Sequence, residues 1–361
     1  MLTPRFAETK SPGERYNLPG AGWLQREPPI PRQIAHCIAC IFAVLLALVT
    51  ECGAARAGPL HIEMGLQQSG TASWELAAMH DLGIDTRHNL EIHIRQLADN
   101  QAGQIALQTG TVDLILSDFI YVALQRAAGN MVTMVPHSLA LGGVMVDASA
   151  GISDVSALRG KEIASAGTPV DKSFVVLEAY YQSKTGRTLM DDATVRFGAP
   201  PLVNQLLLAG RISAALNNWN WNVHAQLAGR IQLISVQQML AELGVPATPP
   251  LLGWVFTDAT AASKHEALTA FLDASFETEQ ALLRNDRAWE DVRPLMDVTD
   301  EAQFTAMRDA YRQGIVRSYD PADSKPIEQS FELLAKYGGK AAVGALTSLP
   351  DGTLYKGYSK S

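Results

Sequence analysis

Hydrophobic and polar positions follow a regular strand and helix order from about residue 60 onward. Leu90, Ile92 and Ile94 alternate with polar neighbours, and this period of two predicts a half-buried strand. Residues 112–116 are apolar except for Asp113, which is typical of a parallel strand covered on both faces. The stretch between these strands has helical spacing. The pattern predicts a βαβαβ unit and therefore an α/β fold.

The same pattern returns about one hundred residues later. The segment IALQTGTVDLILSDF, residues 105–119, aligns with QLLLAGRISAALNNW, residues 205–219, and Gly110 then lies opposite Gly210. Strand and helix patterns recur in any α/β protein, so a chance likeness is the alternative. Because two further strand-like segments align at nearly the same offset, we favour a duplication that produces two lobes.

Turn-forming residues mark two crossings between the lobes. Gly151-Ile152-Ser153-Asp154 opens the second copy, and Thr248-Pro249-Pro250 ends it. Two crossings form a hinge, which permits closure around a ligand. We expect a first lobe over 58–147, a second lobe over 148–250, a returning strand and helices over 251–349 that pack on the first lobe, and a loose tail over 350–361.

The amino-terminal segment has the layout of a secretory signal. Residues 34–50 are almost entirely apolar, Arg26 and Arg32 precede them, and Ala55-Arg56-Ala57 follows. This order predicts a signal peptide over 1–57 that is cleaved after Ala57, with export to the periplasm. A membrane anchor is the alternative, because the apolar run approaches the length that spans a bilayer.

Cysteine and charge content narrow the class of protein. Cys37, Cys40 and Cys52 all precede the predicted cleavage point, so the exported chain has no thiol. The whole chain has 29 basic and 37 acidic residues, and 23 basic and 33 acidic residues remain after residue 57. This acidic balance disfavours nucleic-acid binding. We expect a monomer.

Four loops that follow predicted strands are the candidate binding site, since ligands meet helix N-termini there. Their Ser, Thr and Asp residues could equally cap the following helices. The fourth loop places two tryptophans among asparagines, which favours binding over a plain turn. The candidate residues are Gln67, Ser69 and Thr71; Ser117, Asp118, Phe119 and Tyr121; Gly167, Thr168 and Asp171; and Asn217, Asn218, Trp219 and Trp221.

Absent motifs restrict the ligand and argue against an enzyme. The four loops contain no arginine, which disfavours a strongly anionic ligand and favours a small polar or heteroaromatic molecule. The chain has no Gly-x-Ser-x-Gly elbow and no phosphate loop, so we predict no catalytic residues. The histidines lack metal-binding spacing, and we predict no metal site and no cofactor. His137 and Trp254 lie near the crossings. They could line the floor of the cleft or pack in the hinge, and the sequence leaves both interpretations open.

Two phrases of the sequence resemble a known family. Residues 107–113 match Leu-x-x-Gly-x-Val-Asp, and residues 151–164 match Gly-Ile-x-x-x-x-x-Leu-x-Gly-Lys-x-Ile-Ala. Both are similar to phrases in the substrate-binding proteins of ABC importers, in the nitrate, taurine, alkanesulfonate and thiamine-precursor branch (NMT1/THI5-like, SsuA-like). The chain departs from that pattern at Ser213, where the family usually repeats an aspartate.

The resemblance implies a type 2 periplasmic-binding-protein fold with two lobes and a hinge of two crossovers. It also implies a receptor that delivers a small molecule to an ABC permease in the inner membrane. The alternative hypothesis is a periplasmic accessory protein of the same fold, which partners another exported protein such as a dehydrogenase.

Overall fold

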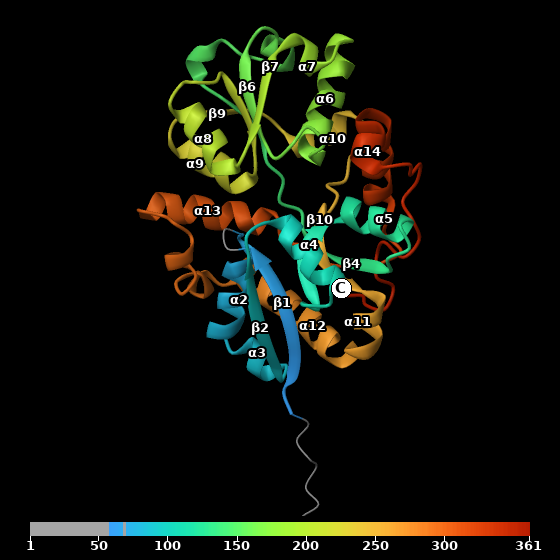
Figure 1. Cartoon of the computed structure of the whole chain (residues 1–361). Coiled ribbons are helices and arrows are strands. Elements are labelled where there is room, and N and C mark those ends of the chain that lie inside the picture. The colour runs from blue at the N-terminus through green and yellow to red at the C-terminus, as the bar shows by residue number, and fades with distance from the viewer. Residues whose placement is uncertain (1–57, 68–69) are drawn as a thin grey trace, which may run out of the picture. The chain divides into compact units, whose positions relative to one another are not determined.

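The computed structural model describes residues 58–67 and 70–361 (Figure 1). The predicted signal peptide, residues 1–57, and the candidate ligand residue Ser69 lie outside the described residues. Within the described part of the chain, no helix combines the length and the apolar character needed to cross a bilayer.

The first lobe is built on a five-stranded mixed sheet in the order β2-β1-β3-β10-β4. The central strand β3 (Leu114–Asp118) pairs in parallel with β1 (Leu60–Gln67), which pairs in parallel with β2 (Leu90–Leu97). Strand β10 (Leu252–Thr257) runs antiparallel between β3 and β4 (Val132–Ser138). The chain therefore returns from the second lobe into the middle of the first sheet.

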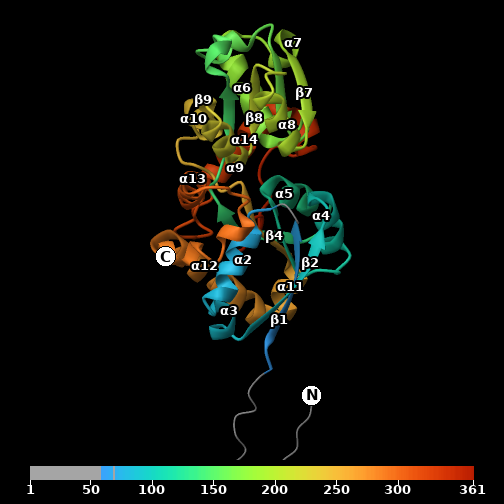
Figure 2. The ribbon, with the colours of Figure 1, turned by 90° about the vertical axis from the view of Figure 1, so that its left-hand side faces the viewer.

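Helices cover both faces of this sheet (Figures 1 and 2). Met64, Leu114 and Phe271 are fully buried in the core between the strands and the helices. Burial of such side chains stabilises the lobe by about 1.5–3 kcal/mol each. The helices of this lobe are α2 (Ala72–Asp81), α3 (Ile84–Arg87), α4 (Asn100–Gln108), α5 (Phe119–Ala127), α11 (Asp258–Ser263) and α12 (His265–Arg284).

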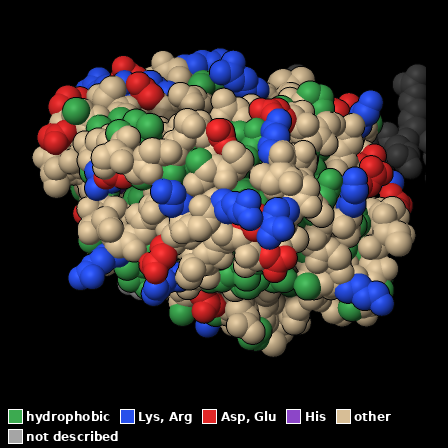
Figure 3. Space-filling model, turned by 90° about the horizontal axis from the view of Figure 1, so that it is seen from above, with side chains coloured by type: hydrophobic (Ala, Val, Ile, Leu, Met, Phe, Trp, Pro, Cys, Tyr) green, Lys and Arg blue, Asp and Glu red, His purple; other side chains and the backbone are tan. Residues whose placement is uncertain are grey.

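The second lobe repeats this architecture in the order β7-β6-β8-β5-β9. Its strands are β5 (Gly143–Val146), β6 (Glu162–Ala166), β7 (Thr194–Gly198), β8 (Ala214–Asn217) and β9 (Ile231–Ser235), and its helices are α6 (Lys172–Thr185), α7 (Leu189–Asp192), α8 (Pro200–Leu208), α9 (Trp219–Leu227) and α10 (Val236–Glu242). Strand β5 is antiparallel to its neighbours and takes the place that β10 has in the first lobe. The two-lobed α/β prediction is confirmed. Figure 3 shows basic and acidic side chains interspersed on the face seen from above.

The duplicated segments have the same local geometry. Gly110 and Gly210 both end a helix with positive φ, 69° and 65°, a conformation that favours glycine. Asp113 and Ser213 then donate their backbone N–H to the carbonyls of Glu63 and Glu162, each at 2.7 Å. The aspartate side chain adds further contacts, because its Oδ2 accepts from the backbone N–H of Glu63 at 2.8 Å and from Nζ of Lys264 at 2.6 Å. The serine at residue 213 has no carboxylate to make such contacts.

The first crossover lies earlier than expected. The expected boundary at residue 147 is wrong, because Gly143–Val146 pairs with β8 and β9 in the second sheet. The chain therefore crosses between the lobes over 139–142 and returns over 243–251. A Cβ at Gly142 would lie 1.7 Å from the carbonyl oxygen of Asn217, so only glycine fits where the crossing meets the fourth loop.

The carboxy-terminal segments join the two lobes. Helix α14 (Lys325–Val343) packs on α5 of the first lobe and on α6 of the second, and α13 (Glu301–Gln313) packs on α9. The expectation that everything after 251 packs on the first lobe is therefore wrong. The tail is not loose either: Thr353 and Leu354 are buried, and Tyr355 donates its backbone N–H to Met134. Long-range pairing orders this segment although it lacks apolar periodicity.

Candidate functional site

The second and third candidate loops meet across the two lobes. Asp118 ends β3, and its Oδ1 caps α5 by accepting from the backbone N–H of Tyr121 at 2.9 Å. Its Oδ2 lies 3.3 Å from Nζ of Lys172, the first residue of α6. Both side chains are 19% exposed. An ion pair therefore links a loop after a strand of the first lobe, β3, to a loop after a strand of the second lobe, β6.

A cavity of about 100 Å³ lies beside this ion pair. It is lined by Asp118, Ile120, Val170, Asp171 and Lys172, with Leu334 and Ala342 of α14. The cavity is thus lined by both charged and aliphatic groups, a combination that suits a small molecule with both characters. Helix α14 was not among the predicted site elements, because nothing in its amphipathic pattern distinguishes a cavity wall from an ordinary core face.

The third loop is arranged to keep Lys172 charged. Burial lowers the pKa of the Lys172 ammonium, but the carboxylates of Asp118 and Asp171 outweigh that effect and raise the pKa above its ordinary value. Asp171 also caps α6, since its Oδ1 accepts from the backbone N–H of Ser173 at 2.9 Å. Gly167 (φ +87°) passes against this carboxylate, where a Cβ would lie 3.1 Å from it, and Thr168 is exposed at the rim.

The fourth loop packs onto the first lobe. The Trp219 ring lies edge-on to Trp74 and to Tyr311, with both centroid distances at 6.1 Å. Trp221 is half-buried, with its ring 5.4 Å from that of His224. The faces predicted to stack on a ligand are thus close to aromatic groups of the protein itself. These contacts join α9 to α13 and α2 across the lobes.

Asparagines shape the start of α9. Asn217 is buried, its Nδ2 donates to the Pro200 carbonyl at 3.0 Å, and its Oδ1 accepts from the backbone N–H of Asn218 at 2.9 Å. Asn218 is exposed and holds the N-cap position. Of these two predicted residues, Asn218 is the one whose side chain faces solvent.

The remaining predicted residues have different surroundings. Phe119 is fully buried in the hydrophobic core, and Tyr121 and Ser117 are also buried. Gln67 donates through its side chain to Asn100, and Thr71 holds the N-cap position of α2. The structure therefore brings Asp118 to the third loop and Trp219 to the first lobe, while Phe119 packs in the core.

Behind Trp74 lies a buried polar cluster that sequence reasoning missed as a group. Nε2 of His137 is 3.3 Å from Oε2 of Glu75, and Nδ1 is 3.5 Å from Oε1 of Glu279. Ser275 donates to Oε1 of Glu75 at 2.5 Å, and the indole N–H of Trp254 donates to Ser275 at 2.9 Å. His137 and Trp254 are thus buried in the core near the hinge and do not line the cleft floor. Glu75 was the one feature of the sequence that could have indicated this cluster, because it is an acidic residue on an otherwise apolar helix face.

Burial sets the charge state of this cluster. It raises the pKa of Glu75 to about 8 and lowers the pKa of His137 to about 4. Burial, with the neighbouring Glu75, also raises the pKa of Glu279. At neutral pH Glu75 therefore carries a proton and His137 is neutral. Burial and the charges of Glu75 and Glu279 raise the pKa of Tyr311. The Tyr311 ring also contacts Trp219 of the second lobe.

A second, larger hollow of about 830 Å³ lies over the crossovers. It is lined by Leu139 and Pro250 from the two crossings, and by Ile315, Arg317 and Lys360 from the carboxy-terminal segments. None of the described residues of the four predicted loops lines it. The smaller cavity at Asp118 and Lys172 is therefore the candidate ligand site.

Sequence and structure comparisons identify the family. The family model described as NMT1/THI5 like matches residues 85–287, which is more than half of the chain. The chain belongs to the NMT1/THI5-like family. A search of curated proteins found no match to this chain.

Solved structures agree with the fold of this NMT1/THI5-like protein. The alkanesulfonate-binding protein SsuA from Xanthomonas axonopodis pv. citri, bound to MOPS, has 17% identity and a TM-score of 0.62 over 83% of this chain and 99% of that one. SsuA from Escherichia coli has 16% identity and a TM-score of 0.63 over 80% and 96%. The nitrate-binding protein NrtA from Synechocystis PCC 6803 has 11% identity and a TM-score of 0.54 over 73% and 71%. These similarities support the type 2 periplasmic-binding-protein fold.

Proposed function

We propose that the protein is a solute-binding receptor that captures a small polar or heteroaromatic molecule between its lobes and delivers it to an ABC importer. The observation that carries this proposal is the Asp118 and Lys172 pair beside its cavity, which joins loops at the strand ends of the two lobes. The proposal is supported by membership of the NMT1/THI5-like family and by the fold shared with sulfonate-binding and nitrate-binding proteins.

The pair offers a ligand one acceptor and one cationic donor. Opening of the hinge would separate Asp118 from Lys172 and leave both groups for a ligand that has a donor and an acceptor of its own. The aliphatic groups of Leu334 and Ala342 would cover the apolar side of such a molecule. A ligand favours closure only through contacts that the open form lacks, and contacts to both lobes meet that condition.

The proposal includes export and a membrane partner. The signal peptide predicted over 1–57 supports a periplasmic location, with cleavage after Ala57. The partner is an ABC permease in the inner membrane, and the receptor acts as a monomer that needs no cofactor and performs no catalysis.

A thermal-shift screen of sulfonates, pyrimidines, amines, ureas and small aromatic acids tests the receptor role. A ligand at about one hundred times its dissociation constant stabilises the protein by about 2.7 kcal/mol, which such a screen detects. For any hit, Asp118→Asn and Lys172→Met should remove most of the shift.

Lys184→Met is the matched control for Lys172→Met. Lys184 lies on the same helix and pairs with Glu242 at 2.6 Å, away from the cavity. Equal ligand affinity in the two lysine variants would refute the cavity assignment. If no ligand class shifts the melting temperature and another exported protein co-purifies with this one, the accessory role would be supported in place of the receptor role.

A further inference from the structure

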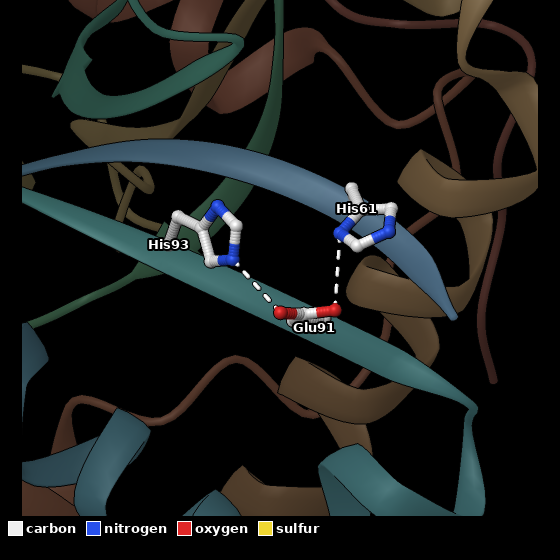
Figure 4. Close-up of side chains that lie close together, drawn as sticks. All are labelled: His61, Glu91 and His93. Carbon is white, nitrogen blue, oxygen red and sulfur yellow. Dashed lines mark hydrogen bonds and ion pairs between the residues drawn. The ribbon is translucent and has the colours of Figure 1, made fainter. Parts of the chain in front are cut away.

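A second cluster of histidine and glutamate side chains lies on the surface of the first lobe (Figure 4). It consists of His61 and Glu63 on β1 and of Glu91 and His93 on β2. His61 and Glu91 are each the second residue of their strand, whereas the candidate ligand loops follow the opposite strand ends. This cluster is therefore separate from the cleft, and an inference about it is independent of the proposed function.

The parallel register brings these residues together. His61 lies opposite Glu91, and Glu63 lies opposite His93. Successive side chains of a strand point to alternate faces, so positions two apart share one face. All four side chains consequently project from the same side of the sheet. They are between 39% and 54% exposed, which leaves room for an ion and for water.

Glu63 orients the His93 ring. Its Oε1 lies 2.9 Å from Nδ1 of His93, so the ring donates that N–H to the carboxylate. The other nitrogen, Nε2, lies 3.0 Å from Oε1 of Glu91, and loss of its proton would leave a lone pair there for a metal ion. A carboxylate that holds one ring nitrogen while the other nitrogen binds a metal is a recurring arrangement in metalloproteins.

His61 completes the set from the other side of Glu91. Its Nδ1 lies 3.2 Å from Oε2 of that carboxylate. One nitrogen of each histidine and one oxygen of Glu91 lie within 4.8 Å of one another. Bonds of about 2.0–2.1 Å to a tetrahedral ion place its ligand atoms roughly 3.3 Å apart, so small side-chain rotations would bring these donors to an ion.

We propose that His61, Glu91 and His93 bind one divalent transition-metal ion, with Glu63 as the residue that positions His93. Two imidazoles and one carboxylate select zinc, copper or nickel over calcium and magnesium, which prefer oxygen ligands alone. Two glutamates and two neutral histidines carry two negative charges, which a divalent ion neutralises. Three protein ligands leave a coordination position for water or for a group from a partner.

Zinc titration of the exported protein by calorimetry tests this site. The protein is purified without a polyhistidine tag and treated with a chelator that is then removed. We expect saturable binding of one Zn²⁺ per chain, which His93→Ala and Glu91→Gln abolish. Glu63→Gln should keep the stoichiometry and weaken binding about 10- to 100-fold.

His80→Ala is the matched control. His80 is an exposed histidine 2.8 Å from the carboxylate of Asp85, but among the residues that the structure describes it belongs to no group of three possible metal ligands, so its loss should leave zinc affinity unchanged. With Cu²⁺ as a probe, electron paramagnetic resonance should report two nitrogen ligands, and His61→Ala should reduce them to one. Absence of saturable binding, or binding that survives His93→Ala, overturns the proposal. Loss of binding in His137→Ala with retention in His93→Ala would assign the ion to the buried cluster instead.

Discussion

The first lobe contains two clusters of the same residue types in opposite environments. In the buried cluster, His137 lies between Glu75 and Glu279, and in the exposed cluster His93 lies between Glu63 and Glu91. Each histidine has one carboxylate near each ring nitrogen. The composition is the same, and the degree of burial differs.

The pKa shifts in the two clusters have opposite signs. Burial lowers the pKa of His137 to about 4, whereas hydrogen bonds to Glu91 and Glu63 raise the pKa of His93. Burial raises the pKa of Glu75 to about 8, whereas the hydrogen bond to His93 lowers the pKa of Glu91. Desolvation outweighs attraction in the first cluster, and pairing outweighs desolvation in the second. A histidine beside two carboxylates is therefore neutral or charged according to its access to water.

The largest expected effect is the pH dependence of stability set by Glu75. Its folded pKa is raised, so its contribution is fully present below the unfolded value of 4.5 and is lost as pH rises toward about 8. His137 has a lowered pKa, and its contribution grows between about 4 and 6.5. The two effects offset each other up to pH 6.5. Above that, the share of Glu75 lowers the free energy of unfolding by about 1.4 kcal/mol per pH unit, or about 2 kcal/mol by pH 8, and Glu279, whose pKa is also raised, adds to this fall.

Glu75→Gln should remove the share of this fall that Glu75 causes, because the amide has the shape of the protonated acid and does not ionise. Urea denaturation at pH 6.5 and pH 8 measures the change in both proteins. Ser275, Tyr311 and Glu279 also face the cluster, and Glu279→Gln is the companion variant because the pKa of Glu279 is raised as well. Identical pH dependence in Glu75→Gln and the parent protein would show that the buried carboxyl is not protonated at neutral pH.

A smaller effect is expected from Trp254→Phe. This change removes the donor to Ser275, which keeps its hydrogen bond to Glu75, so the cost is that of one hydrogen bond, about 0.5–1.5 kcal/mol. Trp289→Phe is the control, since Trp289 is equally buried and its indole N–H donates to the Leu282 carbonyl at 2.8 Å. Chemical denaturation should show both losses, but only Trp254→Phe should alter the fall in stability above pH 6.5. If Trp289→Phe also alters the loss of stability above pH 6.5, the Trp254 hydrogen bond has no specific effect on the charge state of the buried cluster.

The exposed cluster should give the smallest change in stability. In the metal-free protein, Glu91→Gln should leave the urea midpoint unchanged and lower the pKa of His93 toward its ordinary value, because its strongest partner is lost. An imidazole titration by nuclear magnetic resonance measures this pKa. His80 serves as an internal reference, since Asp85 raises its pKa and Glu91→Gln does not touch that pair. If His93 of the parent protein titrates at the ordinary pKa of histidine, pairing with Glu63 and Glu91 does not outweigh desolvation in the exposed cluster.

Much of the architecture was predictable from local patterns. The apolar residues at 114–116 predicted a buried strand, and the paired glycines at 110 and 210 predicted helix ends with positive φ. Both predictions depend only on a short segment of the chain. The duplication and the two lobes followed from these segments. The Asp118 cap was also a local property, since its carboxylate accepts from a backbone N–H three residues later.

The rest depended on residues far apart in the chain. The apolar run at 143–146 is compatible with either sheet, and only its partners β8 and β9 decided the lobe to which it belongs. The tail at 350–361 has no apolar periodicity and is ordered by pairing with Met134 and Tyr319. Trp219 was predicted to face a ligand, and the packing of α9 on α13 decided that its ring meets Trp74 and Tyr311.

The sequence by itself determined the secondary structure, the two copies and the loops that carry polar side chains, because each depends on neighbours within a few positions. Only the tertiary structure decided which of those side chains meet and whether water reaches them. His61 and His93 lack any metal-binding spacing along the chain, and the parallel register of β1 and β2 brings them to one carboxylate. His137 has the same kinds of partner, and its burial among the helices makes it neutral. Pairing register and solvent access are properties of the assembled fold, so neither can be read from a local pattern.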